Sequence, residues 1–385
     1  MKLNCIYPDQ NESNDIKLSP FNIELKNRTG ESKNTNRLII EGERISIELL
    51  PSKGLSVGEA FIDNRPISWE PPIALPNPEE TDLNGSNILI NGEALPGFDY
   101  LETFMGGIEF YGMKNWGMPI ESEDKLQPLH GETSNIPVNE IEIEQKENGI
   151  EISGEFQYYS MNNHNNQTWY KSGEKLYEII QSLYIPNNQN SFSFKTTIKN
   201  ISGKTQVPDW GYHITFLPEE GSKLLIPSKQ TELRGGGKLP NDIETWYPAK
   251  NNNIRTETGF IHKELPDKDG KSFILMKYTD GTGIKLTFPA SPYFQTWFCN
   301  GGANSKEFTY RDGTPLFQKN WDGQGVEIGS SALDHDGNID RLVSYKKELE
   351  NGETREIELN FEYLNKNACS YLEKVIQNYN KNRNN

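Results

Sequence analysis

The chain has 385 residues, of which 34% are hydrophobic and 11% aromatic, and its charged groups sum to a formal charge of −16. Aromatic side chains bury a large area each, so this composition indicates a folded globular protein. The negative charge argues against nucleic acid or an anionic membrane as partner, because both attract a positively charged protein face. A small neutral ligand is compatible with it.

The three cysteines, Cys5, Cys299 and Cys369, are far apart in the sequence. This spacing indicates neither a disulfide framework nor a zinc ribbon. The N-terminal residues have no apolar core typical of a signal peptide, and no apolar run reaches the roughly 18 residues of a membrane span. We therefore expect a cytoplasmic protein that does not cross a membrane, and the sequence leaves its oligomeric state open.

Hairpin patterns recur along most of the chain. Residues 1–36 are polar and rich in asparagine, and we predict an irregular segment there. Alternating apolar residues on both sides of short turns then predict hairpins over Arg37–Leu50, Glu140–Tyr158, Lys175–Asn200, Ser272–Phe288 and Arg341–Tyr363. The loop over Glu70–Leu101 is unusually long, which is often a functional feature.

Helical spacing is confined to the C-terminus, where Ala368, Leu372, Val375 and Tyr379 recur on one face. The sequence therefore predicts an all-β protein, a large twisted antiparallel β-sandwich with a C-terminal helix. We expect one sandwich domain over 37–364, preceded by the irregular segment 1–36 and followed by the helix and tail over 365–385.

One carboxylate lies in a pattern typical of a strand. Glu327 stands between Val326 and Ile328, so alternation puts its side chain on the opposite face from these two apolar residues. Gly325 and Gly329 flank this triplet at positions where a backbone or a ligand can approach closely.

Two of the five histidines have comparable settings. His213 lies on a predicted strand in D-W-G-Y-H-I-T-F, and His130 precedes a glycine turn in P-L-H-G. We interpret the other three, His164, His262 and His335, as solvated side chains. A histidine and a glutamate that converge can act as general acid and general base near neutral pH without a cofactor.

Several short motifs resemble the galactose mutarotase-like (aldose 1-epimerase) superfamily, and most closely its DUF4432 branch. They are L-P-S-K-G-L-S-V-G-E-A, G-G-I-E-F-Y-G-M-K-N-W-G, L-H-G-E-T-S-N-I-P-V, D-W-G-Y-H-I-T-F, P-Y-F-Q-T-W-F and G-V-E-I-G-S-S, in this order. The resemblance implies a sandwich with an open sugar-binding face and no cofactor. It also implies that Glu327 takes the proton of the anomeric hydroxyl, His213 protonates the ring oxygen and His130 orients the sugar.

The chain departs from the family where an arginine usually contacts the substrate. Lys114 and Asn115 occupy that motif, and we expect one of them to serve instead. Lysine presents a point charge in place of a planar fork, so the contacted group is expected to differ. Asp209 and Asp242 are the nearby candidates for the family's substrate-binding aspartate.

Gln295 and Trp297, in P-Y-F-Q-T-W-F, are candidate pocket residues, since an indole is a natural platform for a sugar ring. Three other functions stay open: a sugar sensor without turnover, an iron or zinc site built from the same histidines and glutamate, and a lyase or hydrolase with Tyr212 or Tyr111 as base. The polar segments Lys250–Glu257 and Lys263–Lys271 are predicted as solvated loops.

Overall fold

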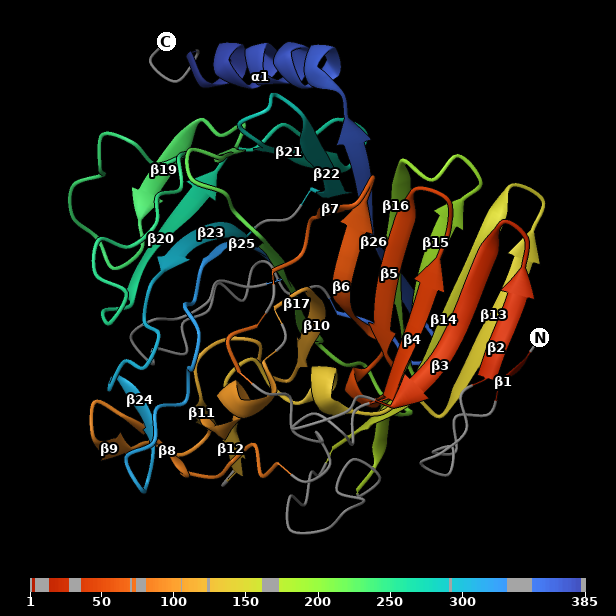
Figure 1. Cartoon of the computed structure of the whole chain (residues 1–385). Coiled ribbons are helices and arrows are strands. Elements are labelled where there is room, and N and C mark those ends of the chain that lie inside the picture. The colour runs from red at the N-terminus through yellow and green to blue at the C-terminus, as the bar shows by residue number, and fades with distance from the viewer. Residues whose placement is uncertain are drawn as a thin grey trace.

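Two large antiparallel sheets make up most of the protein (Figure 1). The computed structural model describes residues 2–3, 14–27, 36–69, 71–73, 81–104, 106–122, 125–160, 173–290, 293–330 and 348–381. Within these ranges one sheet has nine strands and the other has twelve. The predicted antiparallel β-sandwich is therefore confirmed.

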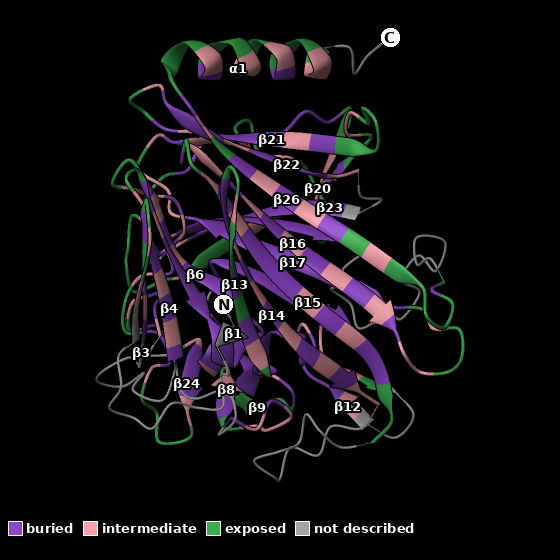
Figure 2. Ribbon diagram, turned by 90° about the vertical axis from the view of Figure 1, so that its right-hand side faces the viewer, coloured by how far each residue is buried: buried purple, intermediate pink, exposed green. Residues whose placement is uncertain are grey.

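The nine-stranded sheet combines three of the predicted hairpins. In spatial order it contains β1 (Lys2–Leu3), β13 (Glu140–Lys146), β14 (Gly149–Tyr159), β15 (Lys175–Pro186), β16 (Ser191–Asn200), β26 (Thr354–Leu364), β22 (Gly283–Pro289), β21 (Lys271–Lys277) and β18 (Lys223–Leu225). Along β16, buried residues alternate with half-buried ones, because one face meets the core and the other meets solvent (Figure 2).

The twelve-stranded sheet combines strands from the N-terminal part of the chain with strands that lie between Asp209 and Gly329. Its order is β19 (Gln230–Leu233), β20 (Thr256–Lys263), β23 (Tyr293–Asn300), β25 (Gly323–Gly329), β17 (Asp209–Phe216), β10 (Ile108–Met113), β6 (Ser56–Ile62), β5 (Ile45–Leu50), β4 (Asn36–Glu41), β3 (Phe21–Asn27) and β2 (Asn14–Leu18), and β7 (Arg65–Pro66) also pairs with β6.

The central strands of this sheet are covered on both faces. Every residue of β17 and β25 is buried, unlike the alternating strands of the other sheet. Val326 and Ile328 belong to the main hydrophobic core. Since Glu327 points the opposite way, something else must cover its face of the sheet.

Small elements provide that cover, and we call them the cap. They are β8 (Ile88–Ile90), β9 (Glu93–Ala94), β11 (Ile120–Ser122), β12 (Lys125–Gln127), β24 (Phe308–Tyr310) and the 3-10 turn η3 (Asp99–Thr103). They lie together below β17 and β10 in Figure 1. Two further 3-10 turns are η2 (Pro51–Lys53) and η4 (Thr133–Asn135). The described part of the long loop over Glu70–Leu101 thus contains β8, β9 and the start of η3.

The expectation of an irregular segment over 1–36 is wrong in part. Strands β2 and β3 form a hairpin that joins the edge strand β4. Ile16 pairs with Ile23, and Leu25 pairs with Leu38, so short apolar stripes hold the segment on the sheet despite its polar composition. The domain boundaries at 36/37 and 364/365 stay a prediction.

The last predicted hairpin differs from the structure. Its second arm is β26, but β26 pairs with β16 and β22, and most of the first arm lies outside the described residues.

The predicted C-terminal helix is confirmed as α1 (Lys366–Lys381). The Asn365 side chain accepts hydrogen bonds from two backbone N–H groups of the first turn, which caps its N-terminus. Cys369 and Ile376 pack against Leu225 and Leu275 at the edge of the nine-stranded sheet. Among the described residues, no helix is both long and apolar enough to cross a lipid bilayer.

Candidate active site

A cavity of about 400 Å³ lies between the twelve-stranded sheet and the cap. Five of the residues singled out in the sequence line it: His130, His213, Gln295, Trp297 and Glu327. They come from segments up to about two hundred positions apart, and the sheet brings them together.

Strand register aligns the polar side chains in one row. Across β10, β17, β25 and β23, Glu109 pairs with His213, His213 with Glu327, and Glu327 with Gln295. Residues paired directly across antiparallel strands point to the same face of the sheet. The row therefore places four polar side chains on the face that is turned to the cap.

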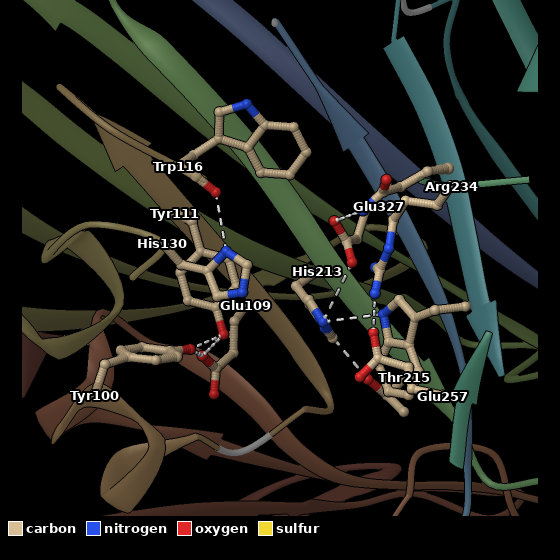
Figure 3. A network of polar contacts seen from close by, with 12 residues as sticks. Tyr100, Glu109, Tyr111, Trp116, His130, His213, Thr215, Arg234, Glu257 and Glu327 are labelled. Carbon is tan, nitrogen blue, oxygen red and sulfur yellow. Dashed lines mark hydrogen bonds and ion pairs between the residues drawn. The ribbon is translucent and has the colours of Figure 1, made fainter. Parts of the chain in front are cut away.

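His213 and Glu327 face each other at the bottom of the cavity (Figure 3). His213 Nε2 lies 3.7 Å from Glu327 Oε1, and each side chain is only 4% exposed. The Trp297 indole N–H donates to His213 Nε2 over 3.2 Å, and Thr215 Oγ1 lies 3.3 Å from Nδ1. Since the indole can only donate, neutral His213 carries its proton on Nδ1.

Burial acts on the two groups in opposite directions. It raises the pKa of Glu327 to about 7, against the positive charge of Arg234 and a hydrogen bond from Gln295. Burial, together with the nearby imidazole of His130, lowers the pKa of His213 well below its usual value. Below about pH 7 the pair thus holds one proton, and that proton rests on Glu327.

The glycines beside Glu327 make room for indole rings. A methyl group at Gly325 would lie 1.9 Å from a ring carbon of Trp297, and one at Gly329 would lie 2.2 Å from a ring carbon of Trp116. The close approach inferred from these glycines therefore involves Trp297 and Trp116. The packing at Gly325 affects the site directly, because it positions the Trp297 indole so that its N–H donates to His213.

His130 enters the cavity from a tight turn. Its φ of 58° is uncommon for a residue with a side chain. Its Nδ1 lies 2.9 Å from the Trp116 carbonyl oxygen, and the ring stacks on Tyr111 with centroids 5.0 Å apart. The carbonyl accepts a hydrogen bond from the Nδ1–H group, which leaves Nε2 as the acceptor nitrogen in the neutral imidazole.

A buried polar network supports the His130 side of the site. Tyr111 donates to Glu109, and the Tyr100 hydroxyl, with its single hydrogen, contacts both the Glu109 carboxylate and the Tyr111 hydroxyl. Lys53 Nζ lies 3.8 Å from Glu109 Oε1 and donates to Asn135 over 2.7 Å. Lys53 and Glu109 are completely buried, so this network holds an ion pair within the protein interior.

Sequence reasoning missed a chain of charges that begins on the same sheet, beside β19 and β20. Arg234 pairs with Glu257, which accepts from Arg255 over 2.7 Å, and Arg255 donates to Glu307 over 2.9 and 3.0 Å. Burial opposes ionisation of Glu257, but the two guanidinium groups lower its pKa to about 2. Arg234 also lies across Gly259, where a methyl group would meet its Nε at 2.7 Å.

The prediction of a solvated loop over Lys250–Glu257 is therefore wrong at its end. Strand β20 begins at Thr256, and Arg255 and Glu257 both line the cavity. The alternation of Arg255, Glu257 and Gly259 on one strand face, and an arginine before three glycines at 234–237, were the available signals.

The structure does not place the predicted arginine substitutes in the cavity lining. Lys114 Nζ donates to the Ser160 carbonyl at 2.5 Å. Asn115 is completely buried and donates to the carbonyls of Met118 and Pro128 at 3.0 and 2.9 Å. These bonds tie loops together, and Arg234 and Arg255 provide the guanidinium groups that line the cavity.

Neither candidate aspartate lines the cavity. Asp209 is buried and accepts from Ser330 over 3.1 Å, and Asp242 caps a turn by accepting from the backbone of Glu244 and Thr245.

Of the histidines interpreted as solvated, His262 is buried, and its two ring nitrogens contact Thr231 and Thr296. That interpretation was wrong for His262, because β20 is an inner strand whose polar positions are covered. His164 and His335 lie outside the described residues.

The described residues contain no group of three histidine, cysteine, aspartate or glutamate side chains arranged to hold a metal ion. Tyr212 packs in the core and contacts Thr196, while the Tyr111 hydroxyl donates to Glu109. The arrangement at the cavity floor is therefore one histidine, one glutamate and their hydrogen-bond partners.

The fold is that of the galactose mutarotase-like sandwich proteins. A candidate aldose 1-epimerase from Klebsiella pneumoniae superposes with a TM-score of 0.72 at 19% identity, covering 99% of this chain and 91% of the other. A galactose mutarotase-like protein from Clostridium acetobutylicum gives 0.53 at 13%, with coverages of 89% and 98%. The Slr1438 protein from Synechocystis gives 0.53 at 14%, with 91% and 98%.

Residues 34–303 match the family described as domain of unknown function (DUF4432), and the chain belongs to this family. No curated protein matches the sequence significantly. At these identities the solved structures establish the shared fold, which is the architecture that the motifs predict.

Proposed function

We propose that the protein interconverts the anomers of an aldose or a modified sugar by acid/base catalysis without a cofactor. The observation that carries this proposal is the pair formed by His213 and Glu327. Both are buried, they face each other at 3.7 Å in a cavity, and burial moves their pKa values in opposite directions. Such a pair supplies one acid and one base in the same site.

In the proposed reaction Glu327 takes the proton of the hydroxyl on C1, and His213 gives a proton to the ring oxygen. Because the proton of the pair rests on Glu327 before the reaction, this division of roles requires that proton to pass to His213 first. The bond between C1 and the ring oxygen breaks, and C1 becomes a carbonyl. Rotation about the C1–C2 bond and closure on the other carbonyl face return both protons. The two groups end as they began, so no further reactant is required.

The other polar residues have positioning roles in this proposal. Gln295 donates to Glu327, and Trp297 donates to His213, so both hold the reacting groups in place. His130, with its ring centroid 5.7 Å from that of His213, lies close enough to contact the same sugar. Arg234 is the cationic group beside Glu327, and it takes the role that sequence analysis gave to Lys114 or Asn115.

Anomer exchange measured by NMR saturation transfer tests the proposal on a panel of neutral, acidic and deoxy sugars. We expect the wild-type protein to accelerate exchange for at least one sugar and Glu327→Gln to abolish the acceleration. Glu48→Gln is the matched control, since Glu48 is equally buried but lies on β5 and pairs with Arg37.

Two results would contradict the proposal. Equal rates for wild type and Glu327→Gln on every sugar would exclude catalysis by this pair. Sugar binding in the same samples, without acceleration, would identify the protein as a non-catalytic sugar-binding protein.

A further inference from the structure

The two walls of the cavity differ sharply in chemistry. The floor, built by the twelve-stranded sheet, carries most of the polar lining residues, which are His213, Arg234, Arg255, Glu257, Gln295 and Glu327. The opposite wall comes from the cap and its flanking turns, and its hydrophobic members are Ile90, Leu95, Phe98, Leu101, Met118, Leu129 and Phe308. We call this second set the roof.

The roof offers few hydrogen-bonding groups to a ligand. Tyr100 also lies there, but its hydroxyl is engaged with Glu109 and Tyr111. Glu307, beside β24, accepts two hydrogen bonds from Arg255. His130, next to the roof residue Leu129, is the exception, since its Nδ1 contacts the Trp116 carbonyl and its Nε2 is an acceptor.

The roof is also fixed in place over the floor. Arg255 joins the sheet residue Glu257 to Glu307, and its guanidinium carbon lies 4.9 Å from the ring centroid of Phe308. Phe308 in turn pairs with Ile90 in the cap sheet. A ligand on the polar floor thus meets an aliphatic surface that is anchored by ionic contacts.

A hydroxyl group pressed against such a surface loses its water and gains no partner. Most of the roof side chains are aliphatic, and Leu95 is still 38% exposed, so hydrophobic surface remains open to a ligand. A sugar with free hydroxyls on every carbon would leave at least one of them unpaired there. A carbon without a hydroxyl, or an esterified oxygen, would bury apolar surface instead.

One buried donor among the lining residues is consistent with a ligand that brings an acceptor oxygen to it. Trp321 lines the cavity and is 6% exposed, and its Nε1 has no hydrogen-bond partner within the described part of the chain. A buried N–H of this kind is rare unless a ligand or water satisfies it.

Resting on the proposed function, we infer that the substrate is a sugar whose end remote from C1 has no free hydroxyl. A deoxy sugar and an O-acylated sugar share this chemistry. The polar floor binds the C1 end, where ring opening occurs, and the roof covers the apolar end.

Matched pairs of sugars that differ at one carbon test the inference. We would measure kcat/KM for anomer exchange with 6-deoxy-D-glucose, 6-O-acetyl-D-glucose and D-glucose, and with 6-deoxy-D-galactose and D-galactose. We expect a modified sugar to be preferred over its parent by about 10- to 100-fold, the range for an added hydroxyl in an apolar pocket. Preference for the deoxy or the acetyl compound identifies which modification the roof accepts. Equal or better turnover of both parent sugars would overturn the inference.

Variants of the roof test whether such a preference depends on the roof side chains. Leu129→Gln places an amide in the roof and should reduce the preference at least fivefold. Leu95→Gln tests the same point at a partly exposed site that tolerates a polar side chain. Leu126→Gln is the control, since Leu126 lies on β12 but does not line the cavity. An unchanged preference in both roof variants would overturn the assignment to these side chains.

Failure of catalysis is distinguishable from failure of the inference. If no sugar is turned over, dissociation constants for the same matched pairs, measured by titration calorimetry, replace the rate constants. Tighter binding of a modified sugar would still support the roof's role, and equal binding of all members would reject it.

Discussion

His213 and Glu327 lie opposite each other on the adjacent strands β17 and β25, with Nε2 3.7 Å from Oε1. This separation exceeds a hydrogen bond, so the two groups are close without being joined. A ligand oxygen between them can lie within hydrogen-bond distance of both. Each group instead receives a hydrogen bond from β23, Glu327 from Gln295 and His213 from Trp297.

The first prediction concerns pH. The reaction needs one proton in the pair, which lets one group act as acid and the other as base. Because the pKa of Glu327 is raised to about 7, the pair loses that proton as the pH rises through about 7. It gains a second proton only below the lowered pKa of His213. We expect kcat/KM to be highest on the acid side of neutrality and to fall about tenfold per pH unit above pH 8.

Measurement of exchange rates between pH 5 and pH 9 checks this profile. Either assignment of the acid and base roles to Glu327 and His213 requires one proton on the pair and predicts the same pH profile. The pH profile therefore tests the pair as a unit. Rates that rise steadily from pH 6 to pH 9 would show that the active pair carries no proton.

The sequence predicted the sheet architecture, and the strand faces of Glu327 and His213, for a physical reason. Alternation fixes which face of a strand a side chain takes, so Val326 and Ile328 could be placed in the core and Glu327 opposite them. The same pattern separates His213 from Tyr212, which lies in the core. Such faces follow from local spacing and need no knowledge of neighbouring strands.

The chain of charges from Arg234 to Glu307 could not be predicted in the same way. Arg234 and Glu257 meet because β19 pairs with β20, and Arg255 meets Glu307 because the cap folds back over the sheet. These contacts depend on long-range pairing, while the local composition around Lys250 is that of a polar loop. The N-terminal strands were missed because polar residues outnumber the short apolar stripes that pair them.

The second prediction concerns Gly325, which allows the Trp297 indole to lie flat on the sheet. In Gly325→Ala the new methyl group would lie 1.9 Å from the ring, so the indole must move and its hydrogen bond to His213 is lost. We expect a loss of about 1–3 kcal/mol in stability from overpacking. We expect exchange activity, normalised to folded protein, to fall at least tenfold.

Gly329→Ala is the matched variant for this experiment. Its methyl group would lie 2.2 Å from the Trp116 ring, so the steric conflict is similar but lies away from Trp297. Urea denaturation and exchange rates should show comparable destabilisation of both variants and a larger activity loss for Gly325→Ala. Equal activity losses would indicate that the position of Trp297 is unimportant for the reaction.

The third prediction uses the lowered pKa of Glu257. Burial opposes its ionisation, but Arg234 and Arg255 hold the folded-state pKa at about 2, below the usual value of 4.5. The stability that this group contributes is therefore complete above about pH 4.5 and is lost as the pH falls toward 2. By pH 3.5 wild type should have lost about 1 kcal/mol through this group alone.

Glu257→Gln removes this titration. We expect the variant to be less stable than wild type at pH 7, and the difference in unfolding free energy to shrink by about 1 kcal/mol at pH 3.5. Urea denaturation at the two pH values measures both quantities. A difference that stays constant or grows on acidification would show that Glu257 is not held ionised by the two arginines.

The fourth prediction concerns the ion pair beneath His130. Lys53 and Glu109 are fully buried, and burial lowers the pKa of Lys53 against the attraction of Glu109. Removing one partner leaves a buried charge without its counterion, which typically costs about 3–5 kcal/mol. We expect Lys53→Met to lose stability in this range by urea denaturation.

The double variant Lys53→Met with Glu109→Gln separates charge compensation from packing. Glutamine can still accept from Tyr111 and Tyr100 through its amide oxygen, so the tyrosine contacts that support His130 can persist. We therefore expect the double variant to be more stable than Lys53→Met alone, which gives a coupling energy of at least about 1 kcal/mol in a double-mutant cycle. Additive losses would show that the two charges do not stabilise each other, and that Lys53 acts through its hydrogen bond to Asn135.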